Sequence, residues 1–293
     1  MRQPPATLRV GLAQIDSNLG DVERNVETHL QSILQARSQG VELLVFPELS
    51  LTGYRLLHLT SRVAARPETS AAVRAIADAS EDMAVVVGMV EEGDDGVLYN
   101  SALFLRRGVI AHTHRKVYLP TYGLFQEKRF FGEGQELGVV SLDAPGSGCG
   151  ILICEDLWHA ETARKLARGG ARILIVISAS PGRIGAGERP ESLEDWEILT
   201  RSAALLNTSW VAYCNRVGWE EGSFYAGGSH FVRPGGEVLS RAPVLDPHLL
   251  IADLDLREVD RLRFKLPLLR EERPEIRGPV VQRRATLGGD RER

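Results

Sequence analysis

The sequence Gly148-Cys149-Gly150-Ile151-Leu152-Ile153-Cys154-Glu155-Asp156-Leu157-Trp158-His159 predicts a buried strand that turns at once into a helix. The apolar run from Gly150 to Ile153 has the length of a strand, and a helical pattern begins near His159. Cys154 is therefore expected at the turn, where a side chain can be exposed and backbone N–H groups can point toward a reacting atom. A single cysteine that ends an apolar strand is more commonly a buried core thiol. Cys154 is reactive only if catalytic partners for it are found elsewhere in the chain.

On both sides of this turn, strands and helices alternate along the chain. The patterning predicts strands over residues 8–15, 41–46, 84–90, 98–105, 109–115, 150–153, 173–177, 210–214, 227–232 and 249–254. Helices are predicted between Asp21 and Gly40 and over residues 67–79, 159–168 and 192–206. The expected apolar face of the first helix consists of Val22, Val26, Leu30, Ile33 and Leu34. Alternating elements mixed with hairpins indicate an α/β fold with two sheets in its core and helices on its outer faces.

The chain is long enough to bury a substantial core, and we expect one domain over residues 1–264. Beyond Lys265 the sequence becomes charged and is broken by prolines, so residues 265–293 are expected to form a C-terminal tail. Two interpretations of this tail remain open: an arm that lies on a surface or on a partner subunit, and a disordered segment.

Composition argues against several classes of function. Of 293 residues, 43% are hydrophobic and 25% are charged, which is typical of a soluble globular protein. The net charge of -4 and the pI of about 6.0 indicate no basic surface for nucleic acid, so small molecules are the expected partners. No stretch approaches a membrane-spanning length and the first residues carry no apolar signal segment, so we expect no membrane association and a cytoplasmic location. The cysteines Cys149, Cys154 and Cys214 match no disulfide or zinc pattern and fit a reducing compartment.

Two other strand ends carry candidate partners for a reactive Cys154. A thiol that attacks a carbonyl carbon needs a base to remove its proton and a positive group where the oxyanion forms. Glu48 follows a buried strand and Pro47, where partial removal from water makes a carboxylate a better base. Lys116 follows the strand 109–115, from which a cation can reach the mouth of the same core. Each of these residues, taken alone, is more commonly a solvated charge.

Three segments resemble, in the right order, the catalytic motifs of the nitrilase superfamily of carbon-nitrogen hydrolases. They are Phe46-Pro47-Glu48-Leu49, His114-Arg115-Lys116-Val117-Tyr118-Leu119-Pro120 and Cys154-Glu155-Asp156-Leu157-Trp158. Residues 119–131 and 178–181 are most similar to one branch, the glutaminase domain of glutamine-dependent NAD synthetases. The resemblance covers nearly the whole chain and implies a single-domain, four-layer α-β-β-α sandwich with mixed sheets. It also implies a homodimer or larger homo-oligomer, and hydrolysis of amides without a cofactor or a metal.

The resemblance implies roles for individual residues of this sequence. Glu48 corresponds to the general base, Lys116 to the cation that stabilises the oxyanion, and Cys154 to the nucleophile that forms a thioester. Glu127 corresponds to a second glutamate that positions the lysine and contacts the substrate nitrogen. The N–H of Glu155 is expected beside the oxyanion. The positions that match the substrate pocket of the glutaminase branch are Tyr54, Tyr122, Phe125, Ser178 and Ser180.

We therefore expect an amidase-type hydrolase that acts on a small linear amide, with glutamine or a related amide as a candidate, and releases ammonia or an amine. The sequence departs from the glutaminase branch in two places. Ser178 stands where that branch usually has asparagine, and the loop 182–189 differs from it. Arg183 or Arg189 in this loop is a candidate for binding a substrate carboxylate through a bidentate pair. No phosphate-binding loop of the synthetase type follows residue 265, so we do not expect this chain by itself to make NAD.

Several alternatives remain open at this stage. The chain could be a glutaminase-type subunit or a catalytically silent scaffold that works with a partner protein, or a true nitrilase. His159, five residues after Cys154, allows a Cys–His pair of the papain type, although a capping or surface position suits it better. His112 and His114 share one face of a strand but have no third ligand nearby in the sequence, so a metal site is not expected.

Overall fold

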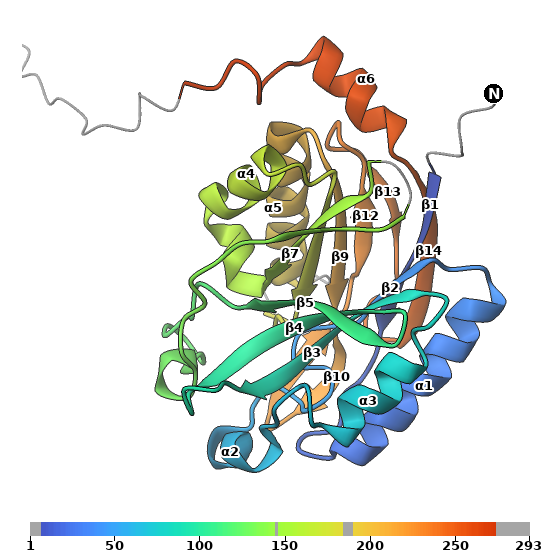
Figure 1. Cartoon of the computed structure of the whole chain (residues 1–293). Coiled ribbons are helices and arrows are strands. Elements are labelled where there is room, and N and C mark those ends of the chain that lie inside the picture. The colour runs from blue at the N-terminus through green and yellow to red at the C-terminus, as the bar shows by residue number, and fades with distance from the viewer. Residues whose placement is uncertain (1–6, 144–145, 184–189, 274–293) are drawn as a thin grey trace, which may run out of the picture.

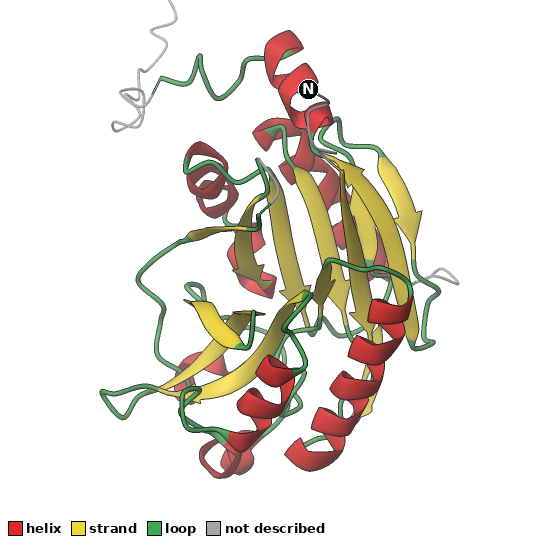
Figure 2. Ribbon diagram, turned by 45° about the vertical axis from the view of Figure 1, so that its right-hand side comes forward, coloured by secondary structure: helices red, strands yellow, loops and turns green. Residues whose placement is uncertain are grey.

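The computed structural model describes residues 7–143, 146–183 and 190–273 of the chain. Two six-stranded sheets lie face to face in the centre of the molecule, and helices cover their outer faces (Figures 1 and 2). This arrangement confirms the predicted four-layer α-β-β-α sandwich. Of the predicted tail, residues 265–273 are described, and residues 274–293 lie outside the described part.

The first sheet combines parallel and antiparallel strands in the order β14-β1-β2-β3-β4-β5. Its strands are β1 (Thr7–Gln14), β2 (Leu43–Val45), β3 (Ala84–Glu92), β4 (Leu98–Arg106), β5 (Val109–Arg115) and β14 (His248–Asp255). Strands β1, β2 and β3 are parallel, whereas β14, β4 and β5 join by antiparallel pairing.

The second sheet has the order β13-β12-β9-β8-β7-β6 and is also mixed. Its strands are β6 (Val139–Ser141), β7 (Gly148–Ile153), β8 (Ile173–Ser178), β9 (Trp210–Asn215), β12 (His230–Val232) and β13 (Val238–Arg241). The central strands β7, β8 and β9 are parallel. A separate hairpin pairs β10 (Val217–Glu220) with β11 (Ser223–Ala226).

The helices form the two outer layers of the sandwich. The helices that cover the sheets are α1 (Val22–Ser38) and α3 (Ala71–Asp78) on the first sheet, and α4 (Ala160–Arg168) and α5 (Glu191–Asn207) on the second. The remaining elements are α2 (Thr60–Val63), α6 (Arg257–Lys265) and the 3-10 turns η1 (Leu57–Leu59), η2 (Glu127–Arg129) and η3 (Cys154–Trp158).

The alternation of side chains along the central strands builds both the middle and the outer layers of the core. Leu43 and Val45 of β2 belong to the cluster between the two sheets, whereas Leu44 packs with Ile33 of α1 on the outer face. A strand that is buried on both faces reads as a continuous apolar run, which is why β2 and β3 could be predicted from the sequence. Burying each such side chain stabilises the fold by about 1.5 to 3 kcal/mol.

The inner face of helix α1 matches the predicted one only in part. Leu34 is 61% exposed, whereas Asn25 and His29 are buried. Asn25 Nδ2 donates to the carbonyl oxygen of Leu51 at 3.0 Å, and His29 Nε2 lies 2.9 Å from Ser50 Oγ. The helix therefore uses polar side chains to hold the loop that follows β2. The prediction of Ile33 and Val26 is confirmed, whereas Leu34 was assigned wrongly and the two polar residues were missed because only apolar residues were counted.

Several elements are absent from the sequence prediction, namely the short edge strands β6 and β13, the hairpin β10–β11 and the helix α6. The hairpin has a signal that could have revealed it. Its two-residue loop consists of Glu221 and Gly222, both with positive φ, as in the type I′ turns that connect tight hairpins. Strand β6 has three residues, which is too short for a periodic pattern to be recognised.

The two sheets meet where the candidate catalytic segments leave them. Glu48 follows β2, Cys154 follows β7 and Ala179 follows β8. The N–H of Ala179 donates to Glu48 Oε2 at 2.8 Å, so the ends of β2 and β8 lie side by side although they belong to different sheets.

Within the part of the chain that the structure describes, no helix has both the length and the apolar character needed to cross a membrane.

Candidate active site

A buried lysine between two glutamates lies at this junction. Lys116 Nζ is 2.7 Å from Glu48 Oε1 and 2.7 Å from Glu127 Oε1. The side chains of Lys116 and Glu48 are fully buried, and that of Glu127 is 4% exposed. Charges removed from water are costly unless they are paired and hydrogen-bonded, so each member of this cluster depends on the others.

Glu48 is fixed by groups from both sheets. Asn100 Nδ2 of β4 donates to Oε1 at 2.8 Å, and the N–H of Ala179 donates to Oε2. Behind this segment, Gly88 of β3 leaves room for the backbone, since a Cβ at residue 88 would lie 2.3 Å from the nitrogen of Leu49. A glycine in the apolar strand β3 is thus explained by the close approach of the Glu48 segment.

Lys116 lies where β5 ends, and the backbone on both sides of it is held. Its N–H donates to the carbonyl oxygen of Asn100 at 2.8 Å, and its own carbonyl oxygen accepts from the N–H of Gly134 at 2.8 Å. Asn100 therefore holds the Lys116 backbone with its main chain and Glu48 with its side chain.

Cys154 begins the turn η3 directly after β7, as the sequence predicts. Its φ of 47° lies in the left-handed region, which is uncommon for a residue other than glycine and is often found at functional sites. Ser178 Oγ donates to Cys154 Sγ at 3.4 Å. The N–H groups of the first turn of a helix have no partner within that helix, so the backbone at Glu155 can donate to a developing oxyanion.

Asp156 joins the cysteine turn to the lysine segment, and the sequence prediction gave it no role. Its Oδ1 accepts from the N–H groups of Val117 and Tyr118, both at 2.9 Å. Its Oδ2 accepts from the N–H of Ile153 at 3.0 Å and lies 2.9 Å from His114 Nε2. One fully buried carboxylate thus fixes the residues that precede Cys154 and follow Lys116. An acidic side chain in the first turn of a helix is a recognised capping signal, which could have revealed the bond to the N–H of Ile153 but not the bonds to the Lys116 segment.

Burial and charge act against each other in this cluster. Burial lowers the pKa of Lys116, but Glu127 and Glu48 outweigh it and hold that pKa well above its usual value. Burial raises the pKa of Glu127 to about 7, against the opposing effect of Lys116. Burial, together with the charge of Glu48, raises the pKa of Cys154 well above its usual value. The thiol is therefore protonated at rest and needs a base at the moment of attack.

A cavity of about 270 Å³ opens onto Cys154. Four of the predicted pocket or oxyanion residues line it, namely Tyr122, Phe125, Glu155 and Ser180. Tyr122 OH donates to Glu155 Oε2 at 2.7 Å, and the rings of Tyr122 and Phe125 meet edge to face. Its lining combines aromatic rings with polar side chains such as Ser180, and its size suits a compact substrate.

Two predicted pocket residues lie elsewhere. Ser178 is fully buried beneath the sulfur of Cys154, so its hydroxyl contacts the thiol and does not line the cavity. Tyr54 lines a neighbouring cavity, and its hydroxyl donates to Glu127 Oε1 at 2.5 Å. Both residues contact the candidate catalytic groups directly.

The sequence profile of the carbon-nitrogen hydrolase family matches residues 9–264. This chain belongs to that family. A carbon-nitrogen hydrolase from Helicobacter pylori G27 has a similar structure, with a TM-score of 0.81, 26% sequence identity, and coverage of 93% of this chain and 97% of the other. An amidase from Nesterenkonia sp. is similar with a TM-score of 0.76 and 26% identity, over 94% of this chain and 96% of the other.

Curated relatives of this carbon-nitrogen hydrolase include glutamine-dependent NAD(+) synthetases. The protein from Thermotoga maritima is 34% identical over 255 residues, which are 86% of this chain and 42% of that protein. The protein from Acinetobacter baylyi is 29% identical, over 86% of this chain and 45% of that protein. The chain thus spans less than half the length of these relatives.

The histidines and the other cysteines that the sequence singled out in this hydrolase lie outside the catalytic cluster. His159 occupies the N-cap position of α4, where its side chain makes no capping hydrogen bond and is 44% exposed, and its ring stacks on Tyr118 with 3.5 Å between ring centroids. His114 is bonded to Asp156, whereas His112 lies on the same strand without forming a cluster. Among the described residues, no group of three or more His, Cys, Asp or Glu side chains could hold a metal ion. Cys149 and Cys214 are buried and unpaired.

Arg183 and Arg189 were the candidates for binding a substrate carboxylate. Arg183 lines the cavity at Cys154, with its side chain 59% exposed and paired with Asp195. Arg189 lies outside the described residues.

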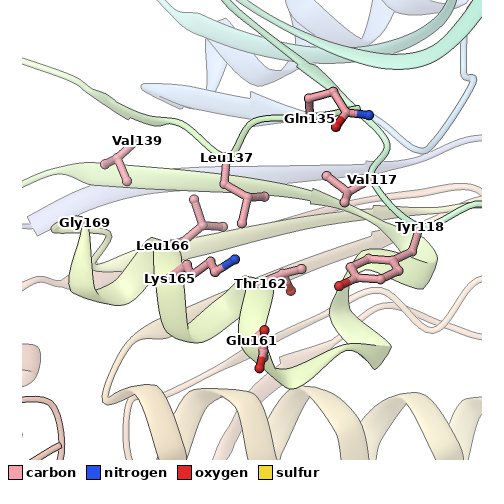
Figure 3. A pocket seen from close by; sticks show the side chains of 10 residues that line it. All are labelled: Val117, Tyr118, Gln135, Leu137, Val139, Glu161, Thr162, Lys165, Leu166 and Gly169. Atoms are coloured by element: carbon pink, nitrogen blue, oxygen red, sulfur yellow. The ribbon is translucent and has the colours of Figure 1, made fainter. Parts of the chain in front are cut away.

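A second, larger cavity of about 540 Å³ lies between α4 and the segment that follows β5 (Figure 3). Val117 and Tyr118 line one side of it, and Thr162, Lys165 and Leu166 of α4 line the other. None of Glu48, Lys116, Glu127 and Cys154 lines this cavity, so its greater size does not make it the site of the chemistry.

Proposed function

We propose that this carbon-nitrogen hydrolase cleaves a small linear amide through a thioester on Cys154 and releases ammonia or an amine. One observation carries the proposal above all others. A charged lysine is held between Glu48 and Glu127, and the charges of Glu48 and Lys116 both act on the thiol of Cys154 beside an open cavity. A base, a cation and a nucleophile are the three groups that acyl transfer to a thiol requires.

In the proposed mechanism, Glu48 takes the proton of the Cys154 thiol as the sulfur attacks the amide carbon. Lys116 and the N–H of Glu155 stabilise the negative charge that develops on the carbonyl oxygen. The tetrahedral intermediate collapses, the carbon-nitrogen bond breaks, and Glu48 gives its proton to the leaving nitrogen. Glu127 orients Lys116 and faces the amine as it leaves.

Hydrolysis of the thioester repeats these steps with water. Glu48 removes a proton from the water, whose oxygen attacks the thioester carbon. The carbon-sulfur bond then breaks and the proton on Glu48 returns to the sulfur. One water is consumed, one carboxylic acid and one ammonia or amine are formed, and Cys154 is again a thiol.

The similar proteins support this chemistry. A mutant of the Nesterenkonia sp. AN1 amidase is described as showing covalent addition of the acetamide moiety of fluoroacetamide at the active site cysteine. That structure has 26% sequence identity and a TM-score of 0.76 with this chain. In the proposal, Cys154 corresponds to that cysteine.

Glutamine or a related amide is the proposed substrate class. The relatives named glutamine-dependent NAD(+) synthetases favour it, and they also favour a second candidate function, a glutaminase unit that passes ammonia to a partner protein. In both cases Arg183 lies where it can meet a substrate carboxylate, which would compete with Asp195 for the guanidinium.

The test is release of ammonia by the purified chain from a matched panel of glutamine, other small linear amides and the corresponding nitriles. The proposal predicts turnover of at least one amide by the chain alone, with no activity in Cys154→Ala. Cys149→Ala and Cys214→Ala are the matched controls, because both remove a buried thiol that does not line the cavity at Cys154. Activity that appears only with a partner would favour the glutaminase unit, and turnover of nitriles alone would make the protein a nitrilase.

A further inference from the structure

A buried ion pair beside the active site has no part in the proposed chemistry. Arg216 directly precedes β10, and Glu220 ends it. Their side chains are 1% and 2% exposed, and Arg216 Nη1 lies 2.5 Å from Glu220 Oε2. A buried ion pair gives little net stability compared with apolar residues of similar size, so its presence raises the question of what it specifies.

Arg216 is fixed by groups from the segment after β1 and from β11. Its Nη2 donates to the carbonyl oxygen of Ser17 at 3.0 Å and to Asp16 Oδ1 at 3.1 Å. Its guanidinium also lies over the ring of Tyr225 in β11, 4.3 Å from the ring centroid. The position of Arg216 is thus determined by both strands of the hairpin and by the segment after β1.

Glu220, which is paired with Arg216, also binds the backbone of the loop that contains Tyr54. Its carboxylate accepts from the N–H of Tyr54 at 3.0 Å and from the N–H of Arg55. Gly53 allows this close approach, because a Cβ there would lie 2.8 Å from the Cα of Leu19 and 3.1 Å from Glu220 Oε2.

A second link joins the same loop to the hairpin. Arg55 Nη1 donates to the carbonyl oxygen of Glu221 at 2.9 Å and to Ser223 Oγ at 3.0 Å. The ring of Tyr54 also meets that of Tyr225 edge to face, with 6.4 Å between centroids. The hairpin therefore holds both the backbone and the ring of Tyr54.

Tyr54 connects the hairpin to the lysine cluster. Its hydroxyl donates to Glu127 Oε1, and the same oxygen lies 2.7 Å from Lys116 Nζ. A displacement of the Tyr54 loop would therefore be transmitted through one hydrogen bond to Glu127, which holds the ammonium.

We propose that Arg216 and Glu220 are positioning residues for the amide-hydrolysing site, which they support by fixing Tyr54 against Glu127 and thereby the ammonium of Lys116. The roles of Lys116 and Glu127 on which this depends are those of the proposed function. Placement of catalytic groups matters strongly, since a misplacement of about 1 Å can reduce a rate on the order of 10²-fold.

Glu220→Gln is the central variant. The amide keeps the size of the side chain but replaces an acceptor oxygen by an N–H₂ group, which then faces either Arg216 or the N–H groups of Tyr54 and Arg55. Tyr54→Phe removes the hydroxyl at the other end of the link. Glu258→Gln is the matched control, because Glu258 of α6 is a half-buried carboxylate paired with Arg233 in another part of the molecule.

Two readouts are measured on folded protein: kcat and KM for an amide substrate, and the rate of Cys154 alkylation by iodoacetamide. We expect Glu220→Gln and Tyr54→Phe each to lower kcat about tenfold or more, with a much smaller change in KM. The rate of Cys154 alkylation should fall along with kcat in both variants. Because both act through one link, the double variant should be no worse than the more affected single variant. Glu258→Gln should match wild type in both readouts.

Wild-type kcat and alkylation in folded Glu220→Gln would overturn the inference, and so would fully additive losses in the double variant. If Glu220→Gln does not fold, Arg55→Met cuts the exposed link to Glu221 and Ser223 without leaving a buried charge. It should then show a smaller loss of kcat in the same direction, and wild-type behaviour would overturn the inference. If no amide is turned over by wild type, the proposed function fails, while the alkylation rates still test the positioning.

Discussion

Lys116 carries its positive charge in a place from which water is excluded. At a separation of 2.7 Å from each glutamate, the ammonium is held by charge-assisted hydrogen bonds, and its pKa stays well above the usual value in spite of burial. A fixed cation in a dry site stabilises a developing oxyanion more than a solvated one, because no reorganisation is needed when the charge appears.

We predict that Lys116→Met lowers kcat by a factor on the order of 10² to 10³, the usual result of removing one oxyanion donor. Methionine keeps most of the stem but lacks the charge. KM for a neutral amide should change far less than kcat, because the lost interaction is made mainly in the transition state. Steady-state kinetics check this, with the exposed Lys165→Met as control. A kcat close to wild type would remove Lys116 from the proposed mechanism.

Glu127 gives a prediction about stability. Burial raises its pKa from 4.5 to about 7, so between these pH values the folded protein keeps a proton that the unfolded chain has lost. The resulting stability is complete below about pH 4.5 and is lost as the pH rises through about 7. A tenfold difference in proton affinity between the folded and unfolded states corresponds to about 1.4 kcal/mol. Wild type should therefore lose stability relative to Glu127→Gln between about pH 5 and pH 7.5.

Urea unfolding of the two proteins at both pH values measures this difference. The comparison cancels the titration of groups that the two proteins share. An equal difference in the free energy of unfolding at both pH values would mean that Glu127 titrates normally in the folded state.

At the residue scale, the sequence predicted the positions of Glu48, Lys116 and Cys154 as strand ends, and the structure brings Glu48 and Lys116 together with Glu127. The sequence could not predict the contacts that Asp156 and Ser178 make across the site. Both act on neighbours that are distant in sequence, Asp156 on the Lys116 segment and Ser178 on Cys154 Sγ. Hydrogen bonds between such partners leave no periodic pattern in the sequence.

At the scale of elements, β3 and the segment after β2 illustrate how the fold sets the position of a side chain. Gly88 lets the backbone of residues 47–49 lie directly against β3, where Glu48 meets Asn100 and Ala179. The apolar pattern predicted β3 correctly, but the need for glycine at residue 88 depends on contact between two strands and their loops.

We predict that Gly88→Ala displaces the Glu48 segment. The added methyl group would lie 2.3 Å from the nitrogen of Leu49 and 2.7 Å from the carbonyl oxygen of Pro47. Overpacking of this kind usually costs about 1 to 3 kcal/mol, and we expect a loss of kcat as well. Thermal unfolding and amide kinetics measure both. Gly235→Ala is the control, since a Cβ there would meet nothing within 4 Å. Equal behaviour of the two variants would contradict the proposed close packing.

The elements that the sequence did not reveal are those whose stability comes from tertiary contacts. Helix α6 is mostly polar and buries Val259 alone, and ion pairs such as Arg172 with Asp260 hold it to the body of the molecule. The hairpin β10–β11 carries the exposed Trp219, so its pattern lacks the clean alternation of a half-buried strand.

At the scale of the whole molecule, assembly stays a prediction. An apolar, strand-rich chain that resembles the nitrilase superfamily is expected to form at least a homodimer. Light scattering at micromolar concentration should therefore give at least twice the monomer mass. Removal of residues 279–293 should weaken the association if the C-terminal tail contributes to an interface. A wild-type particle of monomer mass would contradict this expectation.

The central claim is that the amide carbon becomes bonded to the sulfur of Cys154. The most direct measurement is mass spectrometry of the protein after acid quenching during turnover of an amide, followed by peptide mapping. The account predicts a mass increase equal to the acyl group, located on the peptide that contains Cys154 and absent from Cys154→Ala. An acyl group on Cys149 or Cys214, or turnover that continues in Cys154→Ala, would contradict it.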